Sequence, residues 1–371
     1  MKWSWKLGEI AGIGVYVHAT FLLIIGWIVL VHWGQGLAET LAGVLFVLVL
    51  FACVVLHELG HALTARKYGI KTRDITLLPI GGVARLERMP EDPRQEFWVA
   101  LAGPAVNVVI AAGLFIGLTI SSQLRSPLAF SMAEGSFLER IMFVNLFLVL
   151  FNMLPAFPMD GGRVLRALLA TRMEYTRATH IAALLGQGMA FLFGFVGLFS
   201  NPSLLFIALF VWIGAEQESS MVQMKSALGG IPVRRAMLTD FRTLAPDNPL
   251  SRAVELILAG SQHDFPVVEN GRVVGVLTRA DLLTALAQQQ TATVGEVMRR
   301  DFQIVDASDM LETAFRRLQS SGCSTIPVLH RGELAGLLTS DNVGEFLMIQ
   351  AALGKTPGLP AAVRSAGLRV E

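Results

Sequence analysis

A long apolar run that leads directly into two histidines constrains this chain more than any other feature. Residues 41–56 carry no charged side chain, and residues 57–61 continue them with His-Glu-Leu-Gly-His. The apolar run predicts part of a membrane-crossing helix. On a helix, His57 and His61 share one face, which lets one zinc ion bind both imidazoles, with Glu58 placed to act as a general base. Ionisable groups at membrane depth are costly and are usually functional.

The composition indicates a large membrane-embedded part. The 371 residues are 53% hydrophobic and 16% charged, with a mean hydropathy of +0.56, whereas soluble domains average about 25% charged residues. A net charge of +1 gives no support for nucleic-acid binding. No small-residue cleavage site follows the first apolar run, so we expect it to remain as an anchor.

Six apolar segments predict a polytopic α-helical membrane protein with six transmembrane helices, at 15–33, 38–57, 97–120, 138–155, 180–199 and 203–221. Lysine and arginine gather in the segments after the second and fourth spans. The positive-inside rule therefore places the N-terminus, these loops and the C-terminal region in the cytoplasm. We expect a multi-pass protein of the cell membrane, embedded in the lipid bilayer.

The end of the fourth span is broken by two prolines, Pro155 and Pro158. Irregular backbone at membrane depth is tolerated where protein buries it or a wet cavity solvates it. The predicted topology brings Asp160, which follows the break, to the same side as His57 and His61. These three residues would supply the protein ligands of a catalytic zinc, one ion per chain.

Zinc lowers the pKa of bound water towards about 7, which makes hydroxide available at neutral pH. Glu58 would take the proton of that water. The sequence therefore predicts metal-assisted hydrolysis of a peptide bond.

Three separated motifs agree in their order with one known family: residues 57–61, Gly-Pro-Ala-Val-Asn at 103–107, and the Asn-x-x-Pro-x-x-Pro-x-Asp-Gly pattern from 152 to 161. With these motifs, residues 1–225 resemble the site-2 protease family of intramembrane zinc metalloproteases (peptidase M50-like). The resemblance implies regulated intramembrane proteolysis, the cleavage of a transmembrane segment of a membrane-protein substrate. It also implies Asp160 as the third zinc ligand. Finally, it implies that Asn152 and Asn107 bind the substrate strand or stabilise the oxyanion.

The segment 74–87 is predicted to form two short strands about Gly81 and Gly82. A helix protects its own peptide bonds, so a membrane protease must unwind its substrate. An exposed strand edge here could hold the unwound segment by β-augmentation. In that case proline at Val83 or Ala84 weakens cleavage without loss of zinc. A simple surface hairpin is the alternative.

An internal repeat with an offset of 61 residues occupies the C-terminal region. Matching pairs are 266–268 with 327–329 and 275–278 with 336–339. Each unit is predicted to run strand, helix, strand, turn, strand, helix. The region resembles a tandem pair of cystathionine-β-synthase (CBS) domains, a soluble α/β module. We expect domains at 1–225, 231–290 and 291–350, and a flexible tail at 351–371.

The CBS resemblance implies an adenosine nucleotide between the two repeats. The first repeat has the Thr-x-x-Asp element of that family at Thr278 and Asp281, whereas the second has Thr339 followed by Asn342 in place of the aspartate. That difference weakens the case for a second nucleotide site. A pair used for homodimerisation, or for gating by contact, is the alternative.

Other functions also fit parts of the pattern. Two histidines on a membrane helix could form a proton relay or a structural metal clip, and Asn107 could serve helix packing. A CBS-regulated transporter would need polar residues along a continuous path, whereas here they cluster at one depth. A catalytically inactive scaffold is not favoured, because every catalytic position is filled.

Overall fold

The computed structural model describes residues 3–79, 81–90, 92–121, 135–288 and 292–355. The chain divides into two compact units, Met1–Val222 and Gln223–Glu371. The predicted flexible tail lies outside the described residues from position 356 onwards, and residues 351–355 belong to the last helix.

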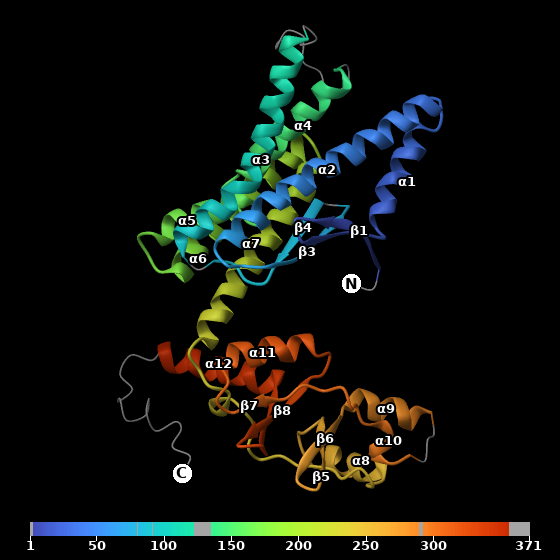
Figure 1. The fold of residues 1–371 in the computed structure, drawn as a ribbon. Coiled ribbons are helices and arrows are strands. Elements are labelled where there is room, and N and C mark those ends of the chain that lie inside the picture. Colours follow the sequence, from blue (N-terminus) through green and yellow to red (C-terminus); the bar gives the residue numbers. More distant parts are fainter. Residues whose placement is uncertain (1–2, 80, 91, 122–134, 289–291, 356–371) are drawn as a thin grey trace. The chain divides into compact units, whose positions relative to one another are not determined.

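The first unit combines a helical bundle with a small sheet beside it (Figure 1). Its elements are β1 (Ser4–Ile10), β2 (Ile13–His18), α1 (Phe21–His32), α2 (Leu37–Lys67), β3 (Thr72–Leu78), β4 (Gly81–Leu86), α3 (Pro93–Ile120), α4 (Phe137–Asn152), α5 (Asp160–Ala170), α6 (Tyr175–Phe199) and most of α7 (Ser203–Leu228), whose last residues belong to the second unit.

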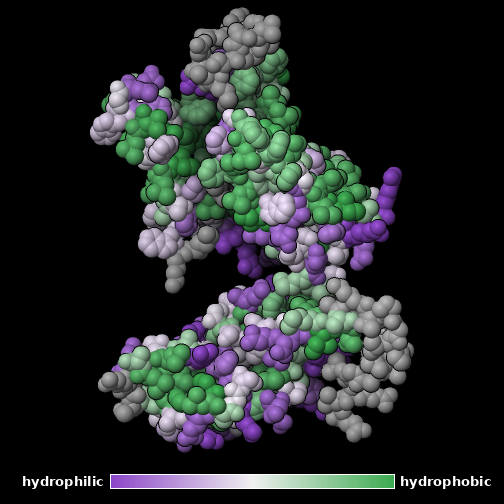
Figure 2. Space-filling view, turned by 180° about the vertical axis from the view of Figure 1, so that it is seen from behind, coloured by the Kyte–Doolittle hydropathy of each residue, from purple (hydrophilic) through white to green (hydrophobic). Residues whose placement is uncertain are grey.

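Among the described residues, four helices are long and apolar enough to cross a membrane: α2, α3, α6 and α7. Each contains a predicted span and extends beyond it at one or both ends. The helix α4, of 16 residues, and the helix α1, of 12 residues, are shorter. Figure 2 shows apolar side chains over much of the surface of this unit. The chain is therefore a membrane protein, and the predicted number of six spans stays a prediction.

The first predicted span differs from the observed structure. Residues 13–18 form β2, and the helix begins only at Phe21. Ile13 and Val15 are buried in alternation along the strand, the two-residue period of a half-buried strand. The strand forms because partners are available on both sides, β1 antiparallel and β3 parallel.

The sheet has the order β1-β2-β3-β4, so β4 is an edge strand. Strands β3 and β4 confirm that 74–87 forms two strands. One face of the sheet packs on α2, where Ile75 and Leu77 share a core with Val55 and Leu59. The sheet therefore lies beside the part of α2 that carries the paired histidines.

The histidines lie within a helix rather than at its end. The predicted second span ended at residue 57, whereas α2 continues to Lys67. Close packing with α3 supports this part of α2, because an added side chain at Gly60 would lie 2.7 Å from the carbonyl oxygen of Ala102. Small residues allow two membrane helices to approach in this way.

The second unit contains the two repeats. The first consists of α8 (Leu250–Ala259), β5 (Phe265–Glu269), β6 (Arg272–Leu277) and α9 (Arg279–Ala287), followed by α10 (Val294–Val297). The second consists of β7 (Val305–Asp306), α11 (Leu311–Ser320), β8 (Thr325–His330), β9 (Glu333–Thr339) and α12 (Ser340–Lys355). A short 3-10 helix, Val233–Arg235, precedes both.

The hairpin turns of the two repeats are equivalent. Both central residues have positive φ in each turn, Asn270 and Gly271 in the first, Arg331 and Gly332 in the second. This is the geometry of a type I′ turn. The first repeat lacks the expected opening strand and has only a parallel bridge between Leu244 and Val267.

Candidate metal centre

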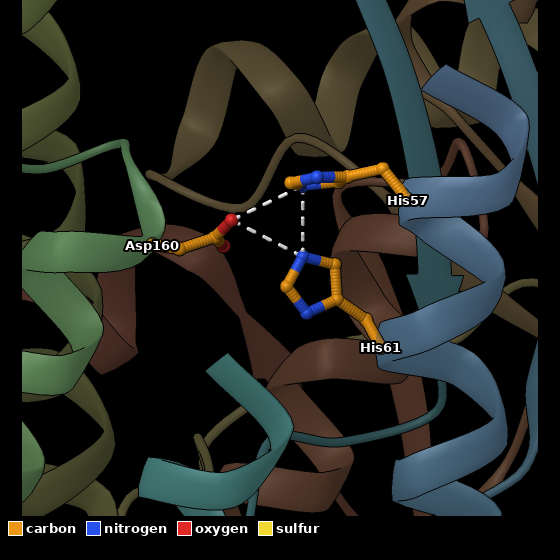
Figure 3. A group of neighbouring side chains, drawn as sticks. All are labelled: His57, His61 and Asp160. Atoms are coloured by element: carbon orange, nitrogen blue, oxygen red, sulfur yellow. Dashed lines mark hydrogen bonds and ion pairs between the residues drawn. The ribbon is translucent and has the colours of Figure 1, made fainter. Parts of the chain in front are cut away.

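Three side chains from two helices converge on one point (Figure 3). His57 and His61 come from α2, and Asp160 comes from the first turn of α5. The Nε2 atoms of the two histidines are 3.1 Å apart. The Oδ2 atom of Asp160 lies 3.2 Å from Nε2 of His57 and 3.1 Å from Nε2 of His61. All three residues are buried.

The other ring nitrogen of each histidine is held by α3. Nδ1 of His57 lies 2.5 Å from Oδ1 of Asn107, and Nδ1 of His61 lies 2.7 Å from the carbonyl oxygen of Val99. Both partners accept a hydrogen bond, so each Nδ1 carries the proton and each Nε2 keeps its lone pair. Val99, Gly103 and Asn107 are spaced by four residues and form one face of α3.

The donor set fits a zinc ion. Two Nε2 lone pairs and a carboxylate oxygen face one another, and a cation between them satisfies all three. Ligand atoms about 2.0 Å from a tetrahedral zinc lie about 3.3 Å apart, close to the observed separations. The hydrogen bonds to Nδ1 are those that usually orient zinc-bound histidines.

A proline-containing loop places Asp160. In the loop between α4 and α5, Ala156 and Phe157 are fully buried. Glycine follows the aspartate twice because the loop folds over the start of α5. An added side chain at Gly161 would lie 2.3 Å from the carbonyl oxygen of Leu154, and one at Gly162 would lie 2.7 Å from Ala156. The Asp-Gly-Gly sequence is therefore required by close backbone contact.

Glu58 lies beside this group in a cavity of about 480 Å³. Its Oε2 accepts a hydrogen bond of 3.2 Å from the backbone N–H of Ala84 on β4. Asn152 also lines the cavity, and its amide donates to the carbonyl oxygen of Leu148. The cavity therefore joins the candidate ligands, the candidate base and the edge strand β4 in one space.

Asn107 occupies a different kind of position. It is fully buried and is not among the residues that line the cavity. Its Oδ1 faces His57, and its Nδ2 donates a hydrogen bond of 2.8 Å to Oδ1 of Asn145. Both ends of the amide are engaged, which argues against the implied role in substrate or oxyanion binding.

A buried ion-pair network near the site was not found from the sequence. Arg166 on α5 donates to Glu96 on α3 and, over 2.5 Å, to Glu218 on α7. The hydroxyl of Tyr175 on α6 also contacts Glu96. The available signal was the presence of charged side chains in otherwise apolar helices.

The predicted nucleotide residues lie at the starts of helices. Thr278 caps α9, and its hydroxyl donates to Asp281 over 2.5 Å. Asp281 also accepts two hydrogen bonds from Arg299, of 2.6 and 3.0 Å. Thr339 bonds Asn342 in the same way in the second repeat. A cavity of about 320 Å³ is lined by Thr278 and Arg299, and also by Asp264 and Ser324. Asp281 is not among its lining residues.

Comparisons with known proteins assign both parts of the chain. Peptidase family M50 matches residues 45–134 and 121–195, and the CBS domain matches residues 233–288 and 294–348. The chain is 33% identical to the zinc metalloprotease MJ0392 of Methanocaldococcus jannaschii over 92% of this chain and 96% of the relative. It is 30% identical to stage IV sporulation protein FB of Bacillus subtilis over 35% and 42% of the two chains.

Among solved structures, the site-2 protease from Methanocaldococcus jannaschii is 39% identical, with a TM-score of 0.44, over 58% of this chain and 95% of that chain. The near full-length match to a zinc metalloprotease, together with the two family matches, identifies the chain as a member of Peptidase family M50 that carries a tandem pair of CBS domains.

Proposed function

We propose that this chain is a zinc metalloendopeptidase that hydrolyses a peptide bond in or near a transmembrane segment of a membrane-protein substrate. The observation that carries the proposal is the convergence of His57, His61 and Asp160, with both Nδ1 atoms engaged by acceptors. Zinc, when bound there, polarises a water molecule and the carbonyl of the scissile bond. In this role His57, His61 and Asp160 are the metal ligands.

Glu58 acts as the general base. Its carboxylate accepts a proton from water and later delivers it to the leaving amine. The hydrogen bond from Ala84 fixes one carboxylate oxygen and leaves the other for water. Asn152, in the same cavity, is placed to donate to the substrate strand or to developing oxyanion charge.

The edge of β4 supplies a binding surface for an unwound substrate segment. The N–H of Ala84 points to Glu58 at the outer edge of β4. Because the backbone groups of successive residues alternate between the two sides of a strand, the N–H and C=O of Gly82 point to the same outer edge. An extended substrate can pair with this edge beside the metal ligands. The same cavity then contains both the bound strand and the base.

The test is Glu58→Gln in full-length protein reconstituted in bilayers. We expect zinc content to stay at one ion per chain and cleavage of a substrate protein to fall below detection. Glu39→Gln, on the same helix, is the matched control. Proteomic comparison of membranes with the two variants should reveal substrates that accumulate uncut with Glu58→Gln. Unchanged cleavage by Glu58→Gln would overturn the assignment.

For the second unit we propose a regulatory role, with adenosine nucleotide bound in the cavity beside Thr278 and Arg299. The N-terminus of α9 favours a phosphate or ribose hydroxyl at this position. As a second role of this unit we propose homodimer formation through the CBS pair. Nucleotide titration of the full chain tests the first role, and the oligomeric state in detergent tests the second.

A further inference from the structure

A row of buried amides connects His57 to α4. Oδ1 of Asn107 lies 2.5 Å from Nδ1 of His57, and Nδ2 of Asn107 donates to Oδ1 of Asn145 over 2.8 Å. Nδ2 of Asn145 in turn donates to the carbonyl oxygen of Ile141 over 2.9 Å. Both asparagines are fully buried. Because the surrounding protein supplies these partners, the orientation of each amide depends on its neighbour.

The direction of these hydrogen bonds is fixed from the far end. The carbonyl oxygen of Ile141 can only accept, so Asn145 must turn its NH₂ group to it and its oxygen to Asn107. Asn107 must then turn its NH₂ group to Asn145 and its oxygen to His57. This places the proton of the His57 imidazole on Nδ1 and leaves the lone pair of Nε2 facing Asp160.

The two histidines differ in this respect. His61 is held by the carbonyl oxygen of Val99, which accepts whatever its surroundings. The partner of His57 is an amide, which could equally present its NH₂ group if nothing fixed it. Only His57 therefore needs a second residue to determine its tautomer.

We propose that Asn107 and Asn145 are positioning residues that set the tautomer of His57 for zinc binding. This inference rests on the proposed zinc site. The second partner of a metal-binding histidine typically changes metal affinity by about 10- to 100-fold when it is replaced. We therefore expect Asn145→Leu to weaken zinc binding about tenfold, although Asn145 does not line the cavity and reaches His57 through Asn107.

The test uses full-length protein in lipid bilayers and two measurements. Zinc affinity is measured by competition with a chelator. The tautomer of His57 is read from ¹⁵N-histidine solid-state NMR spectra of zinc-free protein, assigned with His57→Ala. Thr179→Val is the matched control, because it also removes a buried hydrogen bond within a membrane helix, from Thr179 to the carbonyl of Tyr175.

Asn107→Asp supplies a rescue. A carboxylate accepts from Nδ1 of His57 in any orientation, so it needs no Asn145 to fix it. We expect the double variant Asn107→Asp, Asn145→Leu to recover most of the zinc affinity and the Nδ1–H tautomer. A general loss of stability from Asn145→Leu would not be repaired in this way.

The inference is overturned if Asn145→Leu keeps wild-type zinc affinity and the Nδ1–H signal, or if the double variant binds zinc no better than Asn145→Leu. The proposed function would survive either result, provided that His57→Ala still loses zinc. Retained zinc in His57→Ala would instead refute the proposed metal site itself.

Discussion

Gly103 shows how closely α3 approaches the metal centre. A Cβ atom at this position would lie 2.2 Å from Nε2 of His61 and 2.7 Å from Nε2 of His57. No real Cβ is tolerated at such distances, so even a methyl group must displace the imidazoles. The sequence showed Gly103 as part of a motif, but its contact with both histidines becomes visible only when α2 and α3 are packed together.

We expect Gly103→Ala to lose most of its bound zinc, because the added methyl group occupies the space of both Nε2 atoms. Gly113→Ala on the same helix is the control, since nothing lies within 4 Å of a Cβ there. Zinc per chain, measured by atomic absorption on purified protein, checks the prediction. Equal zinc in both variants would contradict the packing described.

Arg299 controls the availability of Asp281 in the first CBS repeat. Its guanidinium donates two hydrogen bonds to the carboxylate and holds the pKa of Asp281 below its usual value. A depressed pKa in the folded state means that the pair stabilises the fold above about pH 4. This contribution is lost only as the pH falls through the lowered pKa, so near neutral pH the pair persists.

If Asp281 binds a ribose, it must first release Arg299. We therefore expect Arg299→Met to bind adenosine several-fold more tightly than wild type, and Asp281→Asn to bind it more weakly. Adenosine is the suitable probe because it has no phosphate that the lost cation could have bound. Isothermal titration of the full chain measures both affinities, and weaker binding by Arg299→Met would show that Asp281 is not the ribose ligand.

At the scale of elements, the predictions depended on whether a pattern could be assigned without knowledge of its partners. The long apolar helices and the hairpin of each CBS repeat were predicted correctly because their signals are local. The strand β2 was not found, because a short apolar run fits a helix or a strand equally well. Its partner β3 lies more than 50 residues away along the chain.

The edge strand β4 carries a prediction about catalysis. Ala84→Pro removes the N–H that donates to Glu58. The proline ring also obstructs the pairing of another strand with the outer edge of β4. We expect cleavage to fall at least tenfold while zinc is retained, because neither Ala84 nor Glu58 is a metal ligand. Ala84→Gly, which keeps the N–H, is the control and should cleave at nearly the wild-type rate. Full cleavage by the proline variant would exclude β4 as the substrate edge.

The helix α5 is anchored by a buried charge. Arg166 is fully buried, and its replacement by methionine leaves Glu96 uncompensated. Removal of one partner of a buried ion pair costs about 3–5 kcal/mol, so the unfolding temperature of Arg166→Met should fall clearly. Arg172→Met, just beyond α5 and exposed, should leave it unchanged. Thermal unfolding in detergent distinguishes the two variants, and equal stability would show that the network contributes little.

At the scale of the whole molecule, the sequence predicted a membrane protease joined to a CBS pair because each part has a distinctive composition and its own motifs. Composition alone does not determine the number of spans, because α1 and α4 are short. A helix of 12 residues measures about 18 Å, less than the roughly 30 Å of a bilayer core. A crossing at α1 therefore requires residues on either side of the helix as well.

The predicted topology can be tested with single introduced cysteines. We expect Gln35→Cys, between α1 and α2, to react from outside intact cells with an impermeant maleimide. Arg172→Cys should react only after the membrane is opened. Both native cysteines are buried, so they should contribute little background. Labelling of Arg172→Cys from outside would show that the orientation is the opposite of the one predicted. Protection of Gln35→Cys would show that α1 does not cross the membrane.

The division of the metal centre between helices has a consequence for how the ion is exchanged. Two ligands are held by the contact of α2 with α3, whereas Asp160 belongs to α5. A small movement of α5 alone would leave a two-histidine chelate, which binds zinc weakly but keeps its geometry. We therefore expect the rates of zinc loading and release to depend on how firmly Arg166 holds α5 in place.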